Sequence, residues 1–175
     1  MNGHFLVLFP KNAAWAPTSL AILGDALKAI GLLGAERGSG RYSAGPEYLG
    51  LVSYLGCSPQ IALGENDAAT VIHLSGIFEV PLFLHGDNLK TPRCPQCRHV
   101  LASFEAEQEL RCDRCGRTGD ACAFDWRRSA AHARVFVEIS NVFESEAVPG
   151  EPLIACLEAA SGEPWDYCYV RKHGN

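Results

Sequence analysis

The chain has 175 residues, enough for one ordinary domain with a small insertion. Hydrophobic residues make up 47% of it, close to the average for soluble globular proteins, so a buried core can form. No apolar run approaches the roughly 18 residues of a membrane span, and the first residues lack the features of a secretion signal. The formal net charge of -5 argues against a protein that coats nucleic acid with its whole surface. We therefore expect a soluble, cytoplasmic protein that does not enter a membrane.

The first half of the chain predicts several strands and one helix. Residues 4–9 form a short continuous apolar run, which is typical of a strand buried on both faces. A helix is expected to open at residues 17–19, carry leucines at helical spacing and end at Gly31 or Gly34. Residues 38–46 are rich in Gly, Ser and Pro and predict a loop. Further strand-like segments are expected at residues 48–55, 60–63, 70–78 and 81–84.

The second half carries a cysteine-rich segment at residues 91–117, followed by a linker around residues 125–128. Residues 134–140 predict a strand. A second helix is expected to open at residues 149–152 and to stop at Gly162, because proline favours the first turn and glycine the position past the end. Residues 165–170 predict a final strand whose three aromatic side chains alternate onto one face.

The order strand, helix, strand occurs once near each end of the chain, and Ile72–Glu79 resembles Val137–Glu144. These two echoes predict an α+β fold, a ferredoxin-like α/β sandwich with pseudo-repeated β-α-β halves and one inserted zinc ribbon. The expected division is residues 1–90 and 121–175 for the two parts of one sandwich, with the ribbon at residues 91–120. His73 and Glu138 take equivalent places in the two echoing segments, and we expect both on a sheet face.

The most specific motif is Cys94-Pro95-Gln96-Cys97, then fourteen residues, then Cys112-Asp113-Arg114-Cys115-Gly116. Each Cys-x-x-Cys pair can close a tight turn, and two such turns give tetrahedral coordination by four thiolates. Residues 100–104 and 108–111 read as two short strands of the hairpin that joins the turns. This segment of about 25 residues resembles the zinc-ribbon or zinc-knuckle group. We therefore expect one zinc ion per chain, bound by Cys94, Cys97, Cys112 and Cys115.

Two other uses of the four cysteines stay open. A rubredoxin-like iron site would use the same thiolates, and two redox dithiols would use the same pairs. With four thiolate ligands the ion has no open position, so such a site is structural and does not support metal-assisted hydrolysis. We expect a ribbon of this size to lack a core of its own and to depend on the ion for folding. His99 is then expected to be a surface residue.

The cysteine segment is basic and the remainder of the chain is acidic. Residues 90–134 hold nine Lys or Arg against six Asp or Glu, whereas the remainder holds six against fourteen. Arginine favours bidentate contacts with phosphate or carboxylate, and Phe104, Phe124 and Trp126 could stack on bases. Alternatively, the arginines only keep the hairpin in solution. The candidate partner-binding or nucleic-acid-binding residues are Arg93, Arg98, Arg111, Arg114, Arg117, Arg127, Arg128 and Trp126.

The chain lacks a Gly-rich phosphate loop, a nucleophile elbow and a His-Glu-x-x-His motif. Cys57, at a predicted strand end, is the most enzyme-like position, but we expect it to be structural, because Cys57, Cys122, Cys156 and Cys168 all read as small buried hydrophobic residues. The leading hypothesis is a non-catalytic zinc-binding adaptor that recognises a protein partner through the ribbon. The alternative is a nucleic-acid-binding accessory protein, and the third hypothesis is a cysteine-dependent enzyme at Cys57.

Overall fold

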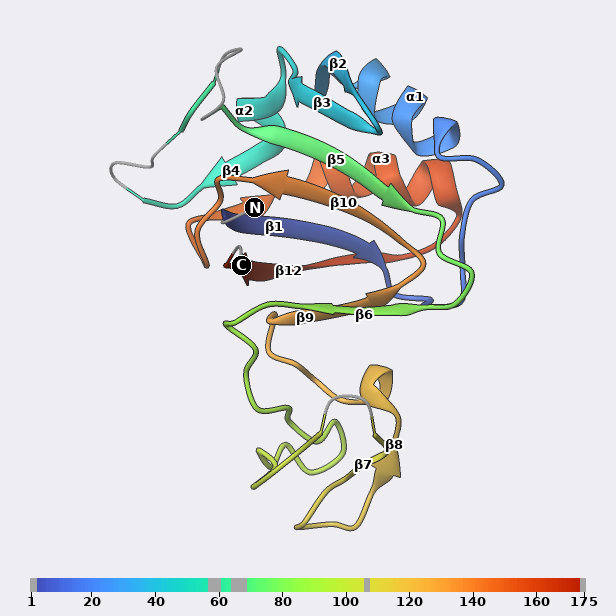
Figure 1. The fold of residues 1–175 in the computed structure, drawn as a ribbon, viewed down its shortest axis with the longest axis vertical. Helices are drawn as coiled ribbons and strands as arrows, with labels where there is room; N and C mark the ends of the chain where they lie inside the picture. The colour runs from blue at the N-terminus through green and yellow to red at the C-terminus, as the bar shows by residue number, and fades with distance from the viewer. Residues whose placement is uncertain (1–2, 57–60, 64–68, 106–107, 174–175) are drawn as a thin grey trace.

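The computed structural model describes residues 3–56, 61–63, 69–105 and 108–173. Their fold is a mixed α/β structure, mostly strands, built on one six-stranded antiparallel sheet with the order β12-β1-β10-β5-β3-β2 (Figure 1). The sheet strands are β1 (Gly3–Pro10), β2 (Leu33–Gly38), β3 (Arg41–Ala44), β5 (Val71–Gly76), β10 (Val135–Ser140) and β12 (Trp165–Lys172). The two strands nearest the chain ends therefore lie side by side within this sheet.

Helices α1 (Ala21–Ala29) and α3 (Glu151–Ser161) cover one face of the sheet. Leu23 and Leu27 of α1 and Leu153 of α3 are fully buried against the sheet, each burial contributing about 1.5–3 kcal/mol. Gly162 ends α3 with a left-handed φ of 72°, a backbone conformation that glycine adopts without steric cost. The predicted bounds of the second helix are confirmed.

A second, smaller layer covers part of the opposite face. Strands β6 (Leu82–His85) and β9 (Ala130–Ala133) pair with each other, and Ala131 and Ala133 pack against Phe5 and Val7 of β1. Strand β1 is consequently buried on both faces, which explains its continuous apolar run. The predicted strand at residues 4–9 is confirmed.

Three predictions in the first half were wrong. Residues 61–63, the described part of the strand expected at residues 60–63, form no strand. Residues 38–46 are not a simple loop, because Gly38 ends β2 and is followed by Ser39 and Gly40, which, with φ of 52° and 72°, form the two-residue turn of the β2–β3 hairpin. Residues 48–55 are not one strand either. They begin as the short helix α2 (Tyr48–Leu51) and continue as β4 (Val52–Tyr54), which pairs with β11 (Ala147–Pro149). Tyr48 and Leu51 lie one helical turn apart and are both buried, a spacing that favours the helix over a strand.

The cysteine segment differs from the expected hairpin. Strand β7 (Leu110–Arg111) pairs with β8 (Thr118–Gly119), so the hairpin encloses the second cysteine pair. Residues 100–104 form no strand, and Val100 makes only an isolated bridge to Arg93. Beyond β8 the chain forms the 3₁₀ turn η1 (Ala121–Ala123).

The expectation that this segment lacks a core was also wrong. A second hydrophobic cluster, separate from the main core, gathers around two of the cysteines and extends to Ala130. Its buried members are Cys94, Leu101, Leu110, Cys112, Ala121, Phe124, Trp126 and Ala130. We call residues 91–130 the cysteine module from here on, because the packing continues past the expected boundary at residue 120.

Candidate metal centre

The two cysteine pairs sit on turns with the same backbone pattern. The N–H of Cys94 donates to the carbonyl of His99, and the N–H of Arg98 donates to the carbonyl of Cys94, at 2.8 and 2.9 Å. In the second turn, Cys112 makes the equivalent pair of bonds with Arg117 and Gly116, also at 2.8 and 2.9 Å. Each pattern curls the chain so that both sulfurs of a pair point to the same side.

The four sulfurs converge on one point. The Sγ atoms of Cys94 and Cys115 lie 3.6 Å apart, those of Cys97 and Cys112 also lie 3.6 Å apart, and all four lie within 4.8 Å of one another. A tetrahedral ion with bonds of about 2.3 Å to sulfur separates its ligands by about 3.8 Å. A disulfide requires about 2.05 Å, so neither contact is one. The four cysteines therefore lie close enough together to hold one metal ion.

The environment of the sulfurs favours a thiolate on one of them. Desolvation acts to raise the pKa of Cys94, but the backbone N–H groups of Cys97 and Gln96 and the neighbouring sulfurs outweigh it and lower that pKa to about 6. The N–H of Arg117 favours the thiolate of Cys115, yet desolvation and the three other sulfurs raise the pKa of Cys115 to about 12. Four sulfurs this close share protons, and a bound cation would displace them.

The left-handed position of each turn is occupied by a different residue type. Gly116 has φ of 76°, and a side chain placed there would meet no neighbouring atom within 4 Å. Arg98 holds the equivalent position of the first turn with φ of 63°. A left-handed conformation costs a non-glycine residue roughly 1–2 kcal/mol, so the first turn is strained where the second is not. The sequence pattern had identified only Gly116.

His99 lies outside the sulfur cluster. Its Nε2 atom lies 2.9 Å from a carboxylate oxygen of Asp113, whose other oxygen accepts the N–H of Ala102 at 3.3 Å. The bond from His99 is the main cause of a lowered pKa at Asp113. The pair joins the first cysteine turn to the second beside the sulfurs. Sequence reasoning had treated His99 as a surface residue and had not identified this link.

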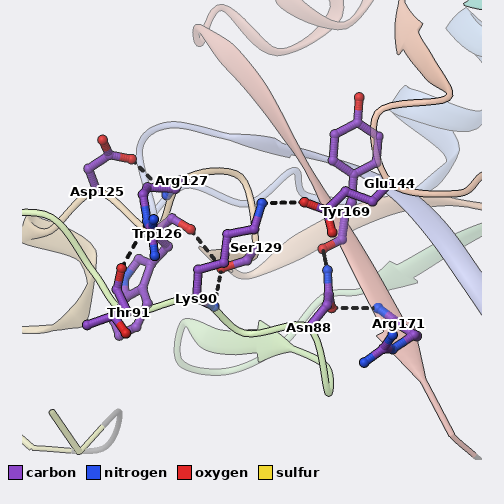
Figure 2. A network of polar contacts seen from close by, with 10 residues as sticks. All are labelled: Asn88, Lys90, Thr91, Asp125, Trp126, Arg127, Ser129, Glu144, Tyr169 and Arg171. Atoms are coloured by element: carbon purple, nitrogen blue, oxygen red, sulfur yellow. Dashed lines mark hydrogen bonds and ion pairs between the residues drawn. The ribbon is translucent and has the colours of Figure 1, made fainter. Parts of the chain in front are cut away.

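Polar contacts fix the base of the module to the sheet (Figure 2). The buried hydroxyl of Ser129 donates to the carbonyl of Trp126 at 2.7 Å and accepts the N–H of Lys90 at 2.9 Å, which ties the two ends of the module together. The side chain of Asn88 bridges β12, donating to the carbonyl of Tyr169 and accepting the N–H of Arg171. Lys90 also pairs with Glu144. The module therefore has a fixed attachment at the outer edge of β12.

The candidate arginines fall into two groups. Arg98, Arg111, Arg114 and Arg117 are exposed on the module itself. Arg93, Arg127 and Arg128 instead line a cleft of about 680 Å³ between the module and the sheet. Trp126 is only 7% exposed, packs against Phe83 and Phe104, and donates its indole N–H to Ala121 at 2.7 Å. A base could not stack on Trp126 in this conformation.

The remaining cysteines do not form a second cluster with the described residues. Cys57 belongs to residues 57–60, which lie outside the described part of the chain. Cys168 is fully buried, and burial raises its pKa; Cys156 is half-buried. Cys122 is exposed, contrary to expectation, but partial burial and the carboxylate of Asp120 raise its pKa to about 11. A thiol of this kind is protonated and weakly nucleophilic at neutral pH.

A second polar cluster lies on the sheet face that the helices do not cover. Glu138 is 7% exposed and accepts hydrogen bonds from Ser75 at 2.7 Å and from Lys172 at 2.9 Å. Nδ1 of His73, its register partner on β5, lies 3.8 Å from it. Burial, with help from Arg41 and Lys172, lowers the pKa of His73, although Glu138 opposes this shift. The expected sheet-face positions of His73 and Glu138 are confirmed.

Within the described ranges, each helix falls short of the length and apolar character that a bilayer crossing requires. No protein-family model, curated protein or solved structure matches this chain.

Proposed function

We propose that this protein is a non-catalytic zinc-binding adaptor that uses the cysteine module as a recognition element for a protein partner. The observation that carries the proposal is the convergence of the Sγ atoms of Cys94, Cys97, Cys112 and Cys115 within 4.8 Å. Four thiolate ligands leave no position for water or substrate, so the ion would stabilise the module and take no part in a reaction. Zinc is favoured over iron because the two tight turns resemble those of zinc ribbons, although thiolates suit both metals.

We infer that the supporting body, residues 1–90 and 131–175 once the cysteine module is set apart, is a ferredoxin-like sandwich. Strands β1 and β5 are both antiparallel to β10, which lies between them, and α1 lies between β1 and β5 in the chain. Strands β10 and β12 flank β1 in the same way, with α3 between them in the chain. Two such split β-α-β units support a ferredoxin-like fold, with one insertion before β5 and the cysteine module inserted between β5 and β10.

A protein partner fits the charge and shape of the molecule better than nucleic acid does. The module extends away from the sheet and its helices (Figure 1), and its four exposed arginines suit carboxylates on an acidic surface. The net charge of -5 opposes general attraction to nucleic acid. The two Cys-x-x-Cys pairs support a reducing compartment such as the cytoplasm, where cysteines at this spacing bind a metal in preference to forming disulfides.

The test compares capture of partners from an extract of the native cell by the zinc-loaded protein and by a Cys94→Ser, Cys112→Ser variant. We expect to find a partner that the zinc-loaded protein captures and that the variant does not capture. An additional Arg98→Gln, Arg114→Gln protein, with its zinc retained, should bind that partner less tightly. Equal capture of the same proteins by all three samples would show that the module is not the recognition element.

Binding to nucleic acid is the second candidate, because Arg111, Arg114 and Arg117 are exposed and the described structure offers their side chains no ion pair. Phosphate contacts release counterions, so affinity for single-stranded RNA or DNA should fall steeply as salt rises. Arg111→Ala together with Arg114→Ala should flatten that dependence. An absence of binding at low salt would eliminate this candidate.

A further inference from the structure

The cleft between the module and the sheet has the size of a small-molecule site. Its volume of about 680 Å³ lies within the roughly 300–1,000 Å³ typical of such sites. Phe9 and Lys11 line it where the chain leaves β1, Tyr167 lines it from β12, and Ala131 lines it from β9. Arg93 lines it from the module. Four separate parts of the chain thus line one space.

The charges lining the cleft are unbalanced. Four basic residues line it, and its two acids already have partners: Asp166 pairs with Arg128 at 2.9 Å, and Asp125 faces Arg98 at 3.5 Å. The side chains of Lys11 and Arg93 have no hydrogen bond or ion pair with the residues that the structure describes. Two uncompensated positive charges in a partly enclosed space attract an anion.

Two further arginines are held in fixed orientations at the cleft. The Nε–H of Arg127 donates to the carbonyl of Thr91 at 3.1 Å (Figure 2), which orients the guanidinium group. The guanidinium of Arg128 stacks 3.7 Å from the centre of the Tyr167 ring and donates to its carbonyl. Both arginines have left-handed backbones, with φ of 50° and 59°. Strained non-glycine positions of this kind concentrate at functional sites.

His132 adds a polar group in need of a partner. Its Nδ1 atom is buried and has no hydrogen-bond partner among the described residues, and its side chain lines the same cleft. Buried polar atoms without a partner are rare, and a water or a ligand group bound in the cleft would satisfy this one.

We propose that this cleft binds a small molecule carrying a phosphate or carboxylate group. Arg93, Lys11 and the terminal nitrogens of Arg127 would take the anionic group, and the stacked pair of Arg128 and Tyr167 would form one wall. The inference rests on the proposed zinc-stabilised module, because the module places Arg93. It adds to that proposal a ligand class and a site distinct from the exposed arginines.

The test is an NMR titration of the ¹⁵N-labelled, zinc-loaded protein with inorganic phosphate and, separately, with succinate, at constant ionic strength. At least one anion should cause saturable shifts at the amides of residues 127–131 and at the Arg127 Nε–H, with a Kd of about 1–10 mM. Tighter binding of phosphate would assign a phosphorylated ligand, and tighter binding of succinate would assign a carboxylate.

Lys11→Gln together with Arg93→Gln should weaken the binding at least about tenfold, whereas the matched exterior pair Arg111→Gln and Arg114→Gln should change it less than about twofold. Arg93→Lys, which keeps the charge, should retain most of the affinity. No saturable shift with either anion, or equal weakening by the two double variants, would overturn the inference. The zinc content is measured in the same samples to separate the two proposals. A zinc-loaded protein that binds neither anion would contradict the cleft site alone. A wild-type protein without zinc would contradict the proposed function.

Discussion

The imidazole of His99 and the carboxylate of Asp113 lie 2.9 Å apart and connect the two cysteine turns beside the sulfur cluster. His99 also accepts the N–H of Cys94 through its backbone carbonyl, so one residue contacts both turns. The pair acts on the relative position of the two turns and leaves the four sulfurs free to coordinate an ion. The candidate centre therefore includes a supporting contact beyond its four cysteines.

The first prediction concerns this pair. His99→Gln and Asp113→Ala should each weaken zinc binding by up to about fivefold, because a polar contact at an exposed position stabilises the structure only weakly. Competition with a chromophoric chelator measures the affinity. The double variant should lose less than the sum of the two single losses, since both remove the same contact. Fully additive losses would mean that the pair does not link the turns.

The second prediction concerns the left-handed positions of the turns. Gly116→Ala should destabilise the module by about 1 kcal/mol, because the added methyl meets no atom but the backbone φ of 76° disfavours any side chain. Arg98→Gly should be neutral or stabilising by up to about 1 kcal/mol, since it removes strain and only a weak surface ion pair with Asp125. Thermal unfolding of the zinc-loaded variants measures both effects. Destabilisation by Arg98→Gly greater than that by Gly116→Ala would contradict the account.

The third prediction concerns Ser129, which is fully buried and bridges the ends of the module. Ser129→Ala should cost about 1–3 kcal/mol, because it leaves the N–H of Lys90 and the carbonyl of Trp126 without this partner. Ser103→Ala, at an exposed position of the same module, is the matched control and should change stability by less than about 0.5 kcal/mol. Equal effects at the two positions would show that the bridge contributes nothing.

The fourth prediction concerns His73 and pH. Burial lowers the folded-state pKa of His73 below its ordinary value of 6.5, so the unfolded chain takes up a proton first as pH falls. The stability that neutral His73 contributes is therefore complete above pH 6.5 and is lost as the pH falls through the lowered pKa. His73→Gln should lose less stability than the wild type as the pH falls below 6.5 in denaturant unfolding. Glu138, Arg41 and Lys172 also face the ring of His73. If the stability of the two proteins depended on pH in the same way, burial would not lower the pKa of His73.

The sequence was informative where the chemistry is local. Each Cys-x-x-Cys pair closes its own turn, and the first predicted strand and second predicted helix are specified by their own apolar pattern, proline and glycine. Contacts between residues that lie far apart in the sequence could not be predicted from local patterns of this kind. Trp126 lies in a polar stretch that reads as a linker, and only its contact with Phe83 of β6 shows that it is buried. Likewise, β7 pairs with β8, which follows the second cysteine pair, and not with residues 100–104. The amino acids of these two short segments do not show which of them will pair with β7.

Because Trp126 is buried against the sheet layer, loss of the metal should destabilise more of the protein than the cysteine module alone. Its cluster includes Ala130 of β9 and contacts Phe83 of β6, so unfolding of the module should spread into the β6–β9 layer. In a Cys94→Ser variant, amide hydrogen exchange should show lost protection over residues 92–124 and weakened protection in β9, with β1 and β10 retained. Cys156→Ser, outside the module, is the control. Loss of protection in β1 together with the module would show that the metal supports the whole fold.

The most direct test of the account is the metal content of protein purified without added metal, measured by elemental analysis and by native mass spectrometry. We expect one zinc ion per chain in the wild-type protein, and almost none in a Cys94→Ser, Cys112→Ser variant. A wild-type protein that contains no metal while its four cysteines remain reduced, or one that contains iron in place of zinc, would contradict it.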